Sequence, residues 1–211
     1  MTKPMKSTAS SSNAERTEQT RGKLIAAGRE LFGQRGYNSV STEQIVQRAQ
    51  VTRGALYHHF DDKRDLFREV AESVEADATK RAAEAALAAA KNGDQPEAWQ
   101  AALNGSRAFL DICLEPEFQR IMIVDAPSVL GQAELTEIAD RHGGALIEGM
   151  LTALIEEKLI KPLAVRPLAR VLTGALINGG LTIAESDDQN VARDEVGTVI
   201  EALLDGLAER E

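Results

Sequence analysis

Residues 41–60, STEQIVQRAQVTRGALYHHF, carry the signals of two short helices joined by a tight turn. Ser41 and Gln44 have the spacing of a capping box, in which a serine and a glutamine three residues later satisfy free N–H groups at a helix start. The helix that they open should end near Ala49, and Thr52 can cap the next one. Two short helices joined in this way predict a helix-turn-helix unit.

Longer helices should flank this pair. Apolar residues at helical spacing predict one helix from about Thr20 to Arg35, with Gly36 as its stop, and another from about Lys63 to Ala90. Val and Ile are scattered at helical spacing rather than alternating with polar residues, so no strand is expected. Further helices should follow, one of them from about residue 134 to 158, with breaks at residues 92–96, 115–118, 161–167 and 185–190. The sequence therefore predicts an all-α protein.

The composition excludes several classes of protein. A single cysteine, Cys113, excludes an internal disulfide framework and a multi-thiolate metal site, and it suits a reducing compartment. No apolar run reaches the roughly 18 residues of a membrane span. Residues 1–19 lack the apolar core of a secretory signal, and their Ser, Thr and charge content predicts a flexible arm. We therefore expect a cytoplasmic protein without membrane association.

Charge is distributed unevenly along the chain, whose net charge is −9. Residues 21–70 hold nine Lys or Arg against six Asp or Glu, which gives +3, and residues 1–20 add +1. Residues 71–211 must then carry −13. The basic N-terminal part could approach phosphate, whereas the acidic remainder would be repelled by it. This asymmetry suggests that the two parts have different functions.

Residues 24–67 resemble the TetR (tetracycline-repressor-like) transcriptional regulators. The segments AAGRELFGQRGY, TRGALYHHF and DKRDLF lie in the order and spacing of that family. The resemblance implies a helix-turn-helix DNA-binding domain over residues 20–66 and a helical effector-binding and dimerisation domain over residues 67–211. Two positions depart from the family pattern. Gln50 replaces a turn glycine, at a cost of about 1 kcal/mol, and Val46 replaces an alanine that faces the third helix.

DNA contacts are expected from the third helix, because the N-terminal part of a recognition helix reaches the base edges of the major groove. Arg53 could bond guanine bidentately, Gly54 would allow close approach, and Ala55 could touch a thymine methyl. With the contacts that the resemblance implies, the predicted DNA-binding residues are Ser41, Thr42, Thr52, Arg53, Gly54, Ala55, Tyr57, His58 and Lys63. Alternatives remain: Tyr57 could be a core aromatic, Ser41 and Thr52 could be helix caps alone, and Arg53 could be solvated.

The adjacent histidines, His58 and His59, could also suggest a metal site or acid–base catalysis. Neighbouring residues on a helix point about 100° apart, so the pair is poorly placed to chelate one ion. His59 or Phe60 should close the small core of the N-terminal domain, which leaves His58 to meet DNA. We therefore predict no metal site, no cofactor and no catalytic residues.

The resemblance implies a small-molecule pocket among the middle helices. Candidate pocket residues, apolar or semi-polar at helical spacing, are Trp99, Phe109, Cys113, Phe118, Met122, His142, Met150 and Ile177. For each of them, packing as a plain core residue is favoured over contact with a ligand. Asp111, Asp125 and Asn178 are further polar candidates. The acidic composition of residues 71–211 could favour a cationic effector, although most of that charge should be solvated surface.

The last two helices suggest a dimer interface. One is rich in small residues and the other has an apolar stripe, so that the pair could dimerise as a four-helix bundle. Glycines inside a helix cost about 1 kcal/mol each and suggest that another backbone comes close. The predicted interface residues are Leu172, Leu176, Gly180, Val196, Val199, Ile200, Leu203, Leu204 and Leu207. Packing of both helices within their own chain is the alternative.

The sequence thus predicts a repressor that binds double-stranded DNA at a palindromic operator as a homodimer and is released by a small-molecule effector. An architectural DNA-binding dimer without an effector is the alternative, and a sizeable enclosed apolar cavity would distinguish the two. An enzyme has little support, because no nucleophile–base spacing or glycine-rich phosphate loop is present in the sequence.

Overall fold

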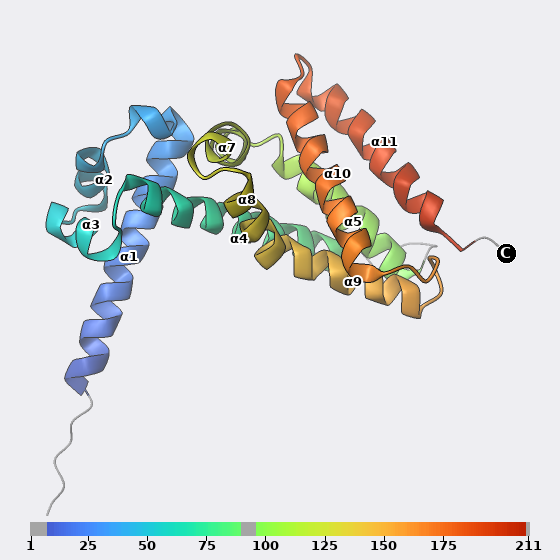
Figure 1. The fold of residues 1–211 in the computed structure, drawn as a ribbon, viewed down its shortest axis with the longest axis horizontal. Helices are drawn as coiled ribbons and strands as arrows, with labels where there is room; N and C mark the ends of the chain where they lie inside the picture. The colour runs from blue at the N-terminus through green and yellow to red at the C-terminus, as the bar shows by residue number, and fades with distance from the viewer. Residues whose placement is uncertain (1–7, 90–95, 210–211) are drawn as a thin grey trace, which may run out of the picture. The chain divides into compact units, whose positions relative to one another are not determined.

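A computed structural model describes residues 8–89 and 96–209 of the chain. The chain divides into two compact units after Ala71, five residues beyond the boundary expected from the sequence. The N-terminal unit holds α1 (Thr8–Arg35), the 3₁₀ turn η1 (Tyr37–Ser39), α2 (Thr42–Ala49), α3 (Arg53–His59) and the first residues of α4 (Lys63–Ala89) (Figure 1). The C-terminal unit begins within α4 and contains all later helices.

The first helix starts earlier than the sequence indicated. α1 begins at Thr8, so that residues 8–19, which were predicted to be part of a flexible arm, are helical. Residues 1–7 of that arm lie outside the described residues. Residues 14–19 are mostly Ala, Glu, Arg and Gln, which favour helix, and the Thr20 hydroxyl donates a hydrogen bond of 2.8 Å to the Arg16 carbonyl. The extension therefore continues a helix whose packed part lies further along the chain.

The core of the N-terminal unit is built from the apolar faces of its helices. Leu24, Phe32, Ile45, Leu56 and Phe67 are fully buried there. The rings of Phe32 and Phe67 meet edge to face with centroids 5.3 Å apart. Such burial contributes about 1.5–3 kcal/mol per large side chain. α2 and α3 are too short to be stable alone, so this core is what holds them.

Both helix starts of the helix-turn-helix unit are capped as predicted. The Gln44 N–H donates to Ser41 Oγ at 3.3 Å, and the Ser41 N–H donates to Gln44 Oε1 at 2.9 Å. The Ala55 N–H donates to Thr52 Oγ1 at 3.2 Å. Gln50 closes α2 in the left-handed conformation, with φ 55° and ψ 43°. The turn is thus the one that usually takes glycine, made here by a glutamine.

The C-terminal unit is also helical (Figure 1). After α4 come α5 (Glu97–Ile112), α6 (Pro116–Phe118), the π-helix η2 (Gln119–Asp125), α7 (Ala126–Val129), α8 (Gln132–Ala139), the π-helix η3 (Asp140–Gly144), α9 (Ala145–Glu156), α10 (Val165–Glu185) and α11 (Gln189–Leu207). The helix expected over residues 134–158 is therefore α8, η3 and α9 in succession. A π-helical turn inserts extra backbone into a helix and is frequent at functional sites.

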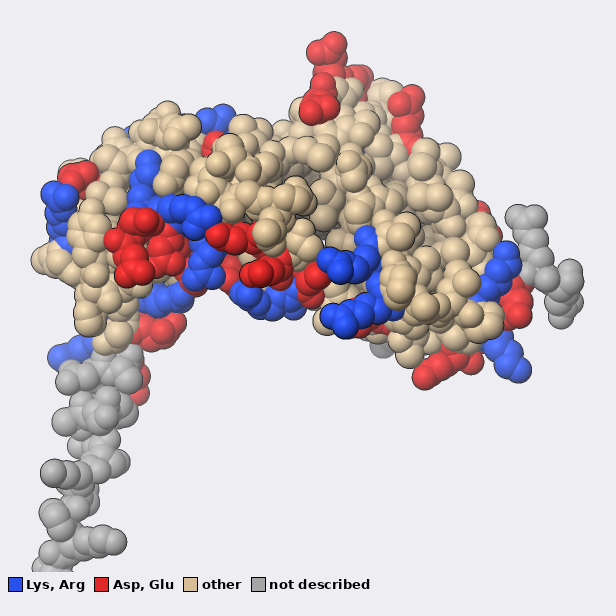
Figure 2. Space-filling view, in the orientation of Figure 1, with Lys and Arg blue, Asp and Glu red and all other residues tan. Residues whose placement is uncertain are grey.

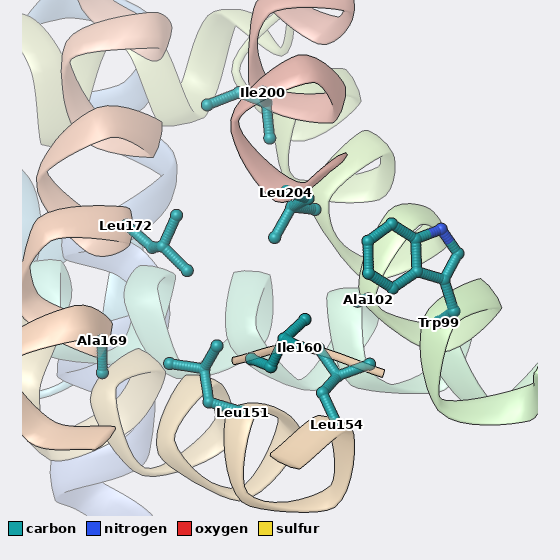
Figure 3. Packing of buried hydrophobic residues seen from close by; sticks show 9 residues of the cluster. All are labelled: Trp99, Ala102, Leu151, Leu154, Ile160, Ala169, Leu172, Ile200 and Leu204. Carbon is teal, nitrogen blue, oxygen red and sulfur yellow. The ribbon is translucent and has the colours of Figure 1, made fainter. Parts of the chain in front are cut away.

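Four helices of this unit enclose a compact apolar core (Figure 3). It joins α5, α9, α10 and α11 through Trp99, Ala102, Leu151, Leu154, Ile160, Ala169, Leu172, Ile200 and Leu204. An isolated antiparallel bridge between Ile160 and Ala208 closes the cluster at the end of α11. The core thereby fixes α10 and α11 as an antiparallel pair.

α10 has the length and hydropathy of a membrane span, with a mean hydropathy of 1.2 over an 18-residue window. One such helix is weak evidence, because core helices of soluble proteins pass the same test. Residues Ala169, Leu172, Gly179, Gly180 and Ile183 of this helix are buried within the unit. Its apolar character therefore has a packing explanation along one face.

Candidate functional site

The outward face of α3 carries most of the side chains predicted to contact DNA. Leu56 is buried and anchors the helix, whereas Arg53, Gly54, Tyr57 and His58 are exposed. The exposed fraction of Tyr57 is 46%, so Tyr57 is not a core aromatic. The remaining predicted residues on α2 and α3 are exposed, as Ser41 and Thr52 are, or half-buried, as Thr42 and Ala55 are. The two helices thus present a continuous polar surface.

Arg53 is held in place by its neighbours on this surface. Its Nη1 lies 3.2 Å from Glu43 Oε1, and its guanidinium carbon lies 5.5 Å from the centre of the Tyr57 ring. Hydrogen bonds with Thr42 and Arg53 lower the pKa of Tyr57. Both partners of the Arg53–Glu43 pair are more than half exposed, and exposed pairs contribute about 0–1 kcal/mol. A guanine edge could therefore take the guanidinium away from Glu43 at little cost.

The two histidines have different surroundings. His58 is exposed, and its ring meets that of His59 edge-on with centroids 5.3 Å apart. Burial lowers the pKa of the half-buried His59, and His58 and Arg21 lower it further. Phe60 is buried and lies beneath the Arg21 guanidinium, 5.6 Å from ring to carbon. As predicted, Phe60 closes the core of the unit and His58 remains on the surface.

Lys63 has a structural role that the sequence did not indicate. Its ammonium donates hydrogen bonds of 3.0 Å to the carbonyls of Tyr37 and Val40 and lies 4.0 Å from the centre of the Tyr37 ring. These contacts fasten η1 to the start of α4. An ammonium has three donors, so one remains for a phosphate. The prediction of a DNA contact stays open, but Lys63 also stabilises the turn before α2.

A cavity of about 450 Å³ lies in the C-terminal unit. Its volume is within the range of pockets that hold small organic ligands. Six of the eight predicted pocket residues line it, namely Phe109, Cys113, Phe118, Met122, Met150 and Ile177. Burial raises the pKa of Cys113 to about 12, so its thiol stays protonated and unreactive. The walls come from all the helices of the unit, α4 to α11, with the π-helices η2 and η3.

Two predicted pocket residues lie elsewhere. Trp99 packs in the core cluster beyond the cavity, and His142 Nε2 lies 3.3 Å from Glu72 Oε1. Helical spacing gave both residues an inward direction, but it could not distinguish a packed layer from a cavity wall. The further polar candidates also lie outside the lining. Asp111 pairs with Arg193, Asp125 is buried near Arg120, and the Asn178 amide donates to the Gly174 carbonyl.

Glu75 is a lining residue that the sequence did not reveal. It lies on α4, whose pattern is that of an amphipathic helix with many charged residues, so nothing in the sequence separates Glu75 from the solvated acids around it. Its carboxyl group is desolvated, and this burial raises its pKa. Asp140 and Arg170 complete the charged lining and form an ion pair of 3.7 Å.

The predicted dimer interface falls on two different faces of α10 and α11. Leu172, Gly180, Ile200 and Leu204 are buried within the unit, so the prediction that they face a partner is wrong. Leu176, Val196 and Leu207 are half-buried against the same core. Val199 and Leu203 alone among the nine are exposed, at 58% and 47%. The apolar stripe of α11 is wide enough for both faces, and its centre packs on α5 and α10.

The glycines of α10 explain why this face of the helix packs against its own chain. A Cβ at Gly179 would lie 2.7 Å from Val196 Cγ1, and one at Gly180 would lie 2.9 Å from Cys113 Sγ. The close approach that these glycines allow is therefore to α11 and α5 of the same chain. At Gly174, in contrast, a Cβ would have nothing within 4 Å, because this position faces open space.

The outward face of α10 and α11 is apolar although its residues were not those predicted. Val171 and Ile177 of α10 are 68% and 42% exposed, and Val199 and Leu203 of α11 are exposed as well. In the view of Figure 2 the surface over these helices is largely free of charged residues. We call Val171, Ile177, Val199 and Leu203 the outward apolar face.

Comparison with known proteins agrees with this architecture. Residues 24–70 match the family of bacterial regulatory proteins of the tetR type, and residues 99–207 match the tetracyclin repressor-like C-terminal domain. The chain is 26% identical over 164 residues to the Transposon Tn10 TetC protein of Escherichia coli, covering 76% of this chain and 78% of that protein. It is 43% identical over 61 residues to the transcriptional regulator AcrR of Shigella flexneri, covering 29% of this chain and 28% of AcrR.

A solved structure is similar over almost the whole chain. The TetR-family transcriptional regulator from Pectobacterium atrosepticum is 33% identical, with a TM-score of 0.79, over 93% of this chain and 97% of that one. The match covers the helix-turn-helix unit and the helical unit with the cavity alike. The protein therefore belongs to the TetR family of DNA-binding transcriptional regulators.

Proposed function

We propose that this regulator represses transcription by binding a palindromic operator as a homodimer, and that a small molecule in the cavity releases it. The observation that carries the proposal is the cavity of about 450 Å³ in the unit that does not hold the recognition helix. An architectural DNA-binding protein without an effector would have no use for such a space. The cavity thus favours an effector-responsive regulator, and the chain acts in the cytoplasm, where its DNA is.

Base recognition falls to α3. Arg53 exchanges Glu43 for the O6 and N7 of a guanine, which gives about 1–3 kcal/mol of discrimination at that base pair. Tyr57 and His58 follow on the same face, and the caps Ser41 and Thr52 meet phosphates at the helix starts. The third N–H of the Lys63 ammonium and the Thr42 hydroxyl contact further phosphates of the DNA backbone.

The outward apolar face joins two copies of the chain. A palindromic operator presents two half-sites about 34–36 Å apart, and each chain has one recognition helix. The outward apolar face offers exposed Val, Ile and Leu side chains that a second copy could cover. A charge at its centre, as in Val199→Glu, should convert the dimer to a monomer in sedimentation experiments, whereas Thr198→Glu on the same helix should have less effect.

The first experiment is selection of bound DNA from a random library, followed by a footprint and the stoichiometry on the selected sequence. An inverted repeat bound by an even number of chains supports the proposal and supplies the operator for an effector screen. Selection of no sequence would instead favour the architectural hypothesis, since the protein would then hold DNA through phosphates alone.

A further inference from the structure

Glu75 is the feature of the cavity that plain packing does not explain. The residue retains some exposed surface because it borders the cavity, but its carboxyl group is enclosed by protein and desolvated. Burying a carboxylate without a partner strongly disfavours its charged form. Within residues 8–89 and 96–209, this carboxyl has no hydrogen bond or ion pair.

Glu75 borders the cavity, and the groups described around it form no hydrogen bond with its carboxyl. A methyl placed on Gly143 of η3 would lie 3.7 Å from Glu75 Oε1 and 3.8 Å from Thr79 Oγ1, so that the absence of a side chain there keeps the carboxyl uncovered. Cys113, which follows the last residue of α5, stays a neutral thiol. The neighbouring His142 is engaged with Glu72.

The rest of the lining indicates the chemical character of the uncharged part of a ligand. Phe109 and Phe118 meet edge to face with centroids 6.0 Å apart, and Met122, Met150 and Ile177 continue the apolar wall. Aromatic faces and methionine sulfurs suit an apolar or aromatic body, and aromatic faces also attract cations. The charged lining consists of Glu75 and the Asp140–Arg170 pair, so the acids exceed the bases by one.

We infer that the ligand of this cavity is a mostly apolar organic cation, an amine or a quaternary ammonium ion, whose positive charge is neutralised by Glu75. The inference deepens the proposed function and rests on it in treating that ligand as the effector. An anion would be repelled by the Glu75 carboxylate, and Arg170 could not compensate because it is already paired with Asp140. A neutral ligand would leave the carboxyl without a charge partner. A cation satisfies both the charge and the apolar wall.

Binding of such a cation should be coupled to a proton. Burial raises the pKa of Glu75 in the free protein, and His142 partly opposes the rise. A bound cation favours the carboxylate and lowers this pKa, so a permanent cation releases a proton on binding and binds more tightly as pH rises through the free-protein pKa. The other charged or titratable groups around the carboxyl are Glu72 on α4, Cys113 on α5, Asp140 and His142 on η3 and Arg170 on α10.

The test uses the full-length protein and pairs of probes that differ only in charge. Each pair is an aryl-methyl trimethylammonium ion, with a phenyl, naphthyl or biphenyl body, and its isostere with a quaternary carbon in place of nitrogen. Affinities are measured by calorimetry for the wild type, Glu75→Gln and Glu84→Gln. Glu84 lies on the same helix, is exposed and does not line the cavity, so Glu84→Gln is the matched control.

We expect Glu75→Gln to weaken binding of the best ammonium probe by about 10-fold to 100-fold, the size of a charged hydrogen bond or ion pair, and to leave its carbon isostere nearly unchanged. Glu84→Gln should bind both like the wild type. In the wild type, heats measured in buffers of different ionisation enthalpy should reveal proton release that Glu75→Gln lacks. Tighter binding of the isosteres than of the ammonium ions by the wild type would overturn the inference, as would equal loss of both in Glu75→Gln.

Proton release in the wild type does not depend on any variant, so the inference remains testable if Glu75→Gln fails to fold. Operator binding is measured separately, with no probe present. If the probe results overturn the inference but the operator footprint is intact, the repressor proposal stands and the ligand belongs to another chemical class. Ammonium binding without any selected DNA sequence would contradict the repressor proposal and keep the cavity assignment.

Discussion

The helix-turn-helix unit and the cavity-bearing unit are built by different kinds of sequence signal. In the first, Ser41 and Thr52 cap the helices that they precede in the chain, and contacts between residues close in sequence define the exposed face of α3. In the second, Glu75, Cys113 and Ile177 meet around one cavity from three helices far apart in sequence. Local signals therefore determine where the DNA-reading helices begin, whereas the ligand site depends on tertiary packing alone.

The largest expected effect is a loss of stability in the packed core of the cavity-bearing unit. Leu154 is fully buried there and does not line the cavity. Leu154→Ala should lower the free energy of unfolding by about 2–5 kcal/mol, because it removes buried methyl groups and leaves a void. Urea unfolding measures this loss. A change below about 1 kcal/mol would show that the cluster in Figure 3 is loosely packed.

A second variant tests the close approach of α10 and α11. Gly179→Ala places a methyl 2.7 Å from Val196 Cγ1 and should destabilise the unit by about 1–3 kcal/mol. Gly149→Ala on α9 is the control, because nothing lies within 4 Å of the added methyl. That substitution should stabilise its helix by up to about 1 kcal/mol. The same sign of change for both variants would contradict the packing of these two helices.

Base recognition should respond to a substitution that leaves the fold intact. Arg53→Ala should remove about 1–3 kcal/mol of discrimination at one base pair of each half-site while non-specific binding changes little. Competition with single-base operator variants measures the discrimination. Arg48→Ala is the matched control on α2, where Arg48 pairs with Glu30 at 2.6 Å. If Arg48→Ala relaxes specificity as much, α3 is not the reading helix.

The smallest expected effect tests the local origin of the DNA-reading surface. Ser41→Ala removes one of the two hydrogen bonds of the capping box and should cost about 0.5–2 kcal/mol of stability. Affinity for operator should fall with it, since α2 and α3 share a core, while ammonium probes should bind the cavity unchanged. Titrations of the two ligands against one preparation compare these outcomes. A parallel loss of both affinities would mean that the two units are not separate.

The sequence was sufficient for features that depend on neighbours along the chain. It located the caps at Ser41 and Thr52, the left-handed turn at Gln50 and the exposed His58 beside the buried Phe60. With the family resemblance, which implied a pocket among the middle helices, it also named six residues that line the cavity. Helical periodicity, however, does not show how deeply a side chain is buried. It therefore assigned Trp99 to the pocket and missed Glu75, whose burial depends on what α5 and η3 place in front of it.

The assignment of Leu172, Gly180, Ile200 and Leu204 to a dimer interface was wrong for a related reason. An apolar stripe as wide as that of α11 has two edges, and the pattern does not tell which edge the chain covers with its own helices. Ile200 and Leu204 turned out to be covered by the chain itself, and Val199 and Leu203 were not. The glycines gave a signal that could have decided this, since Gly179 and Gly180 lie on the face that approaches α11 and α5.

Ile177 belongs at once to the cavity lining and to the outward apolar face. Its side chain therefore borders the cavity and is also partly exposed. A ligand in the cavity and a partner that covers the exposed residues of α10 would then both contact this isoleucine. Occupancy of the cavity would then alter the fit of that partner directly, by a change of the Ile177 rotamer, without passing along a helix.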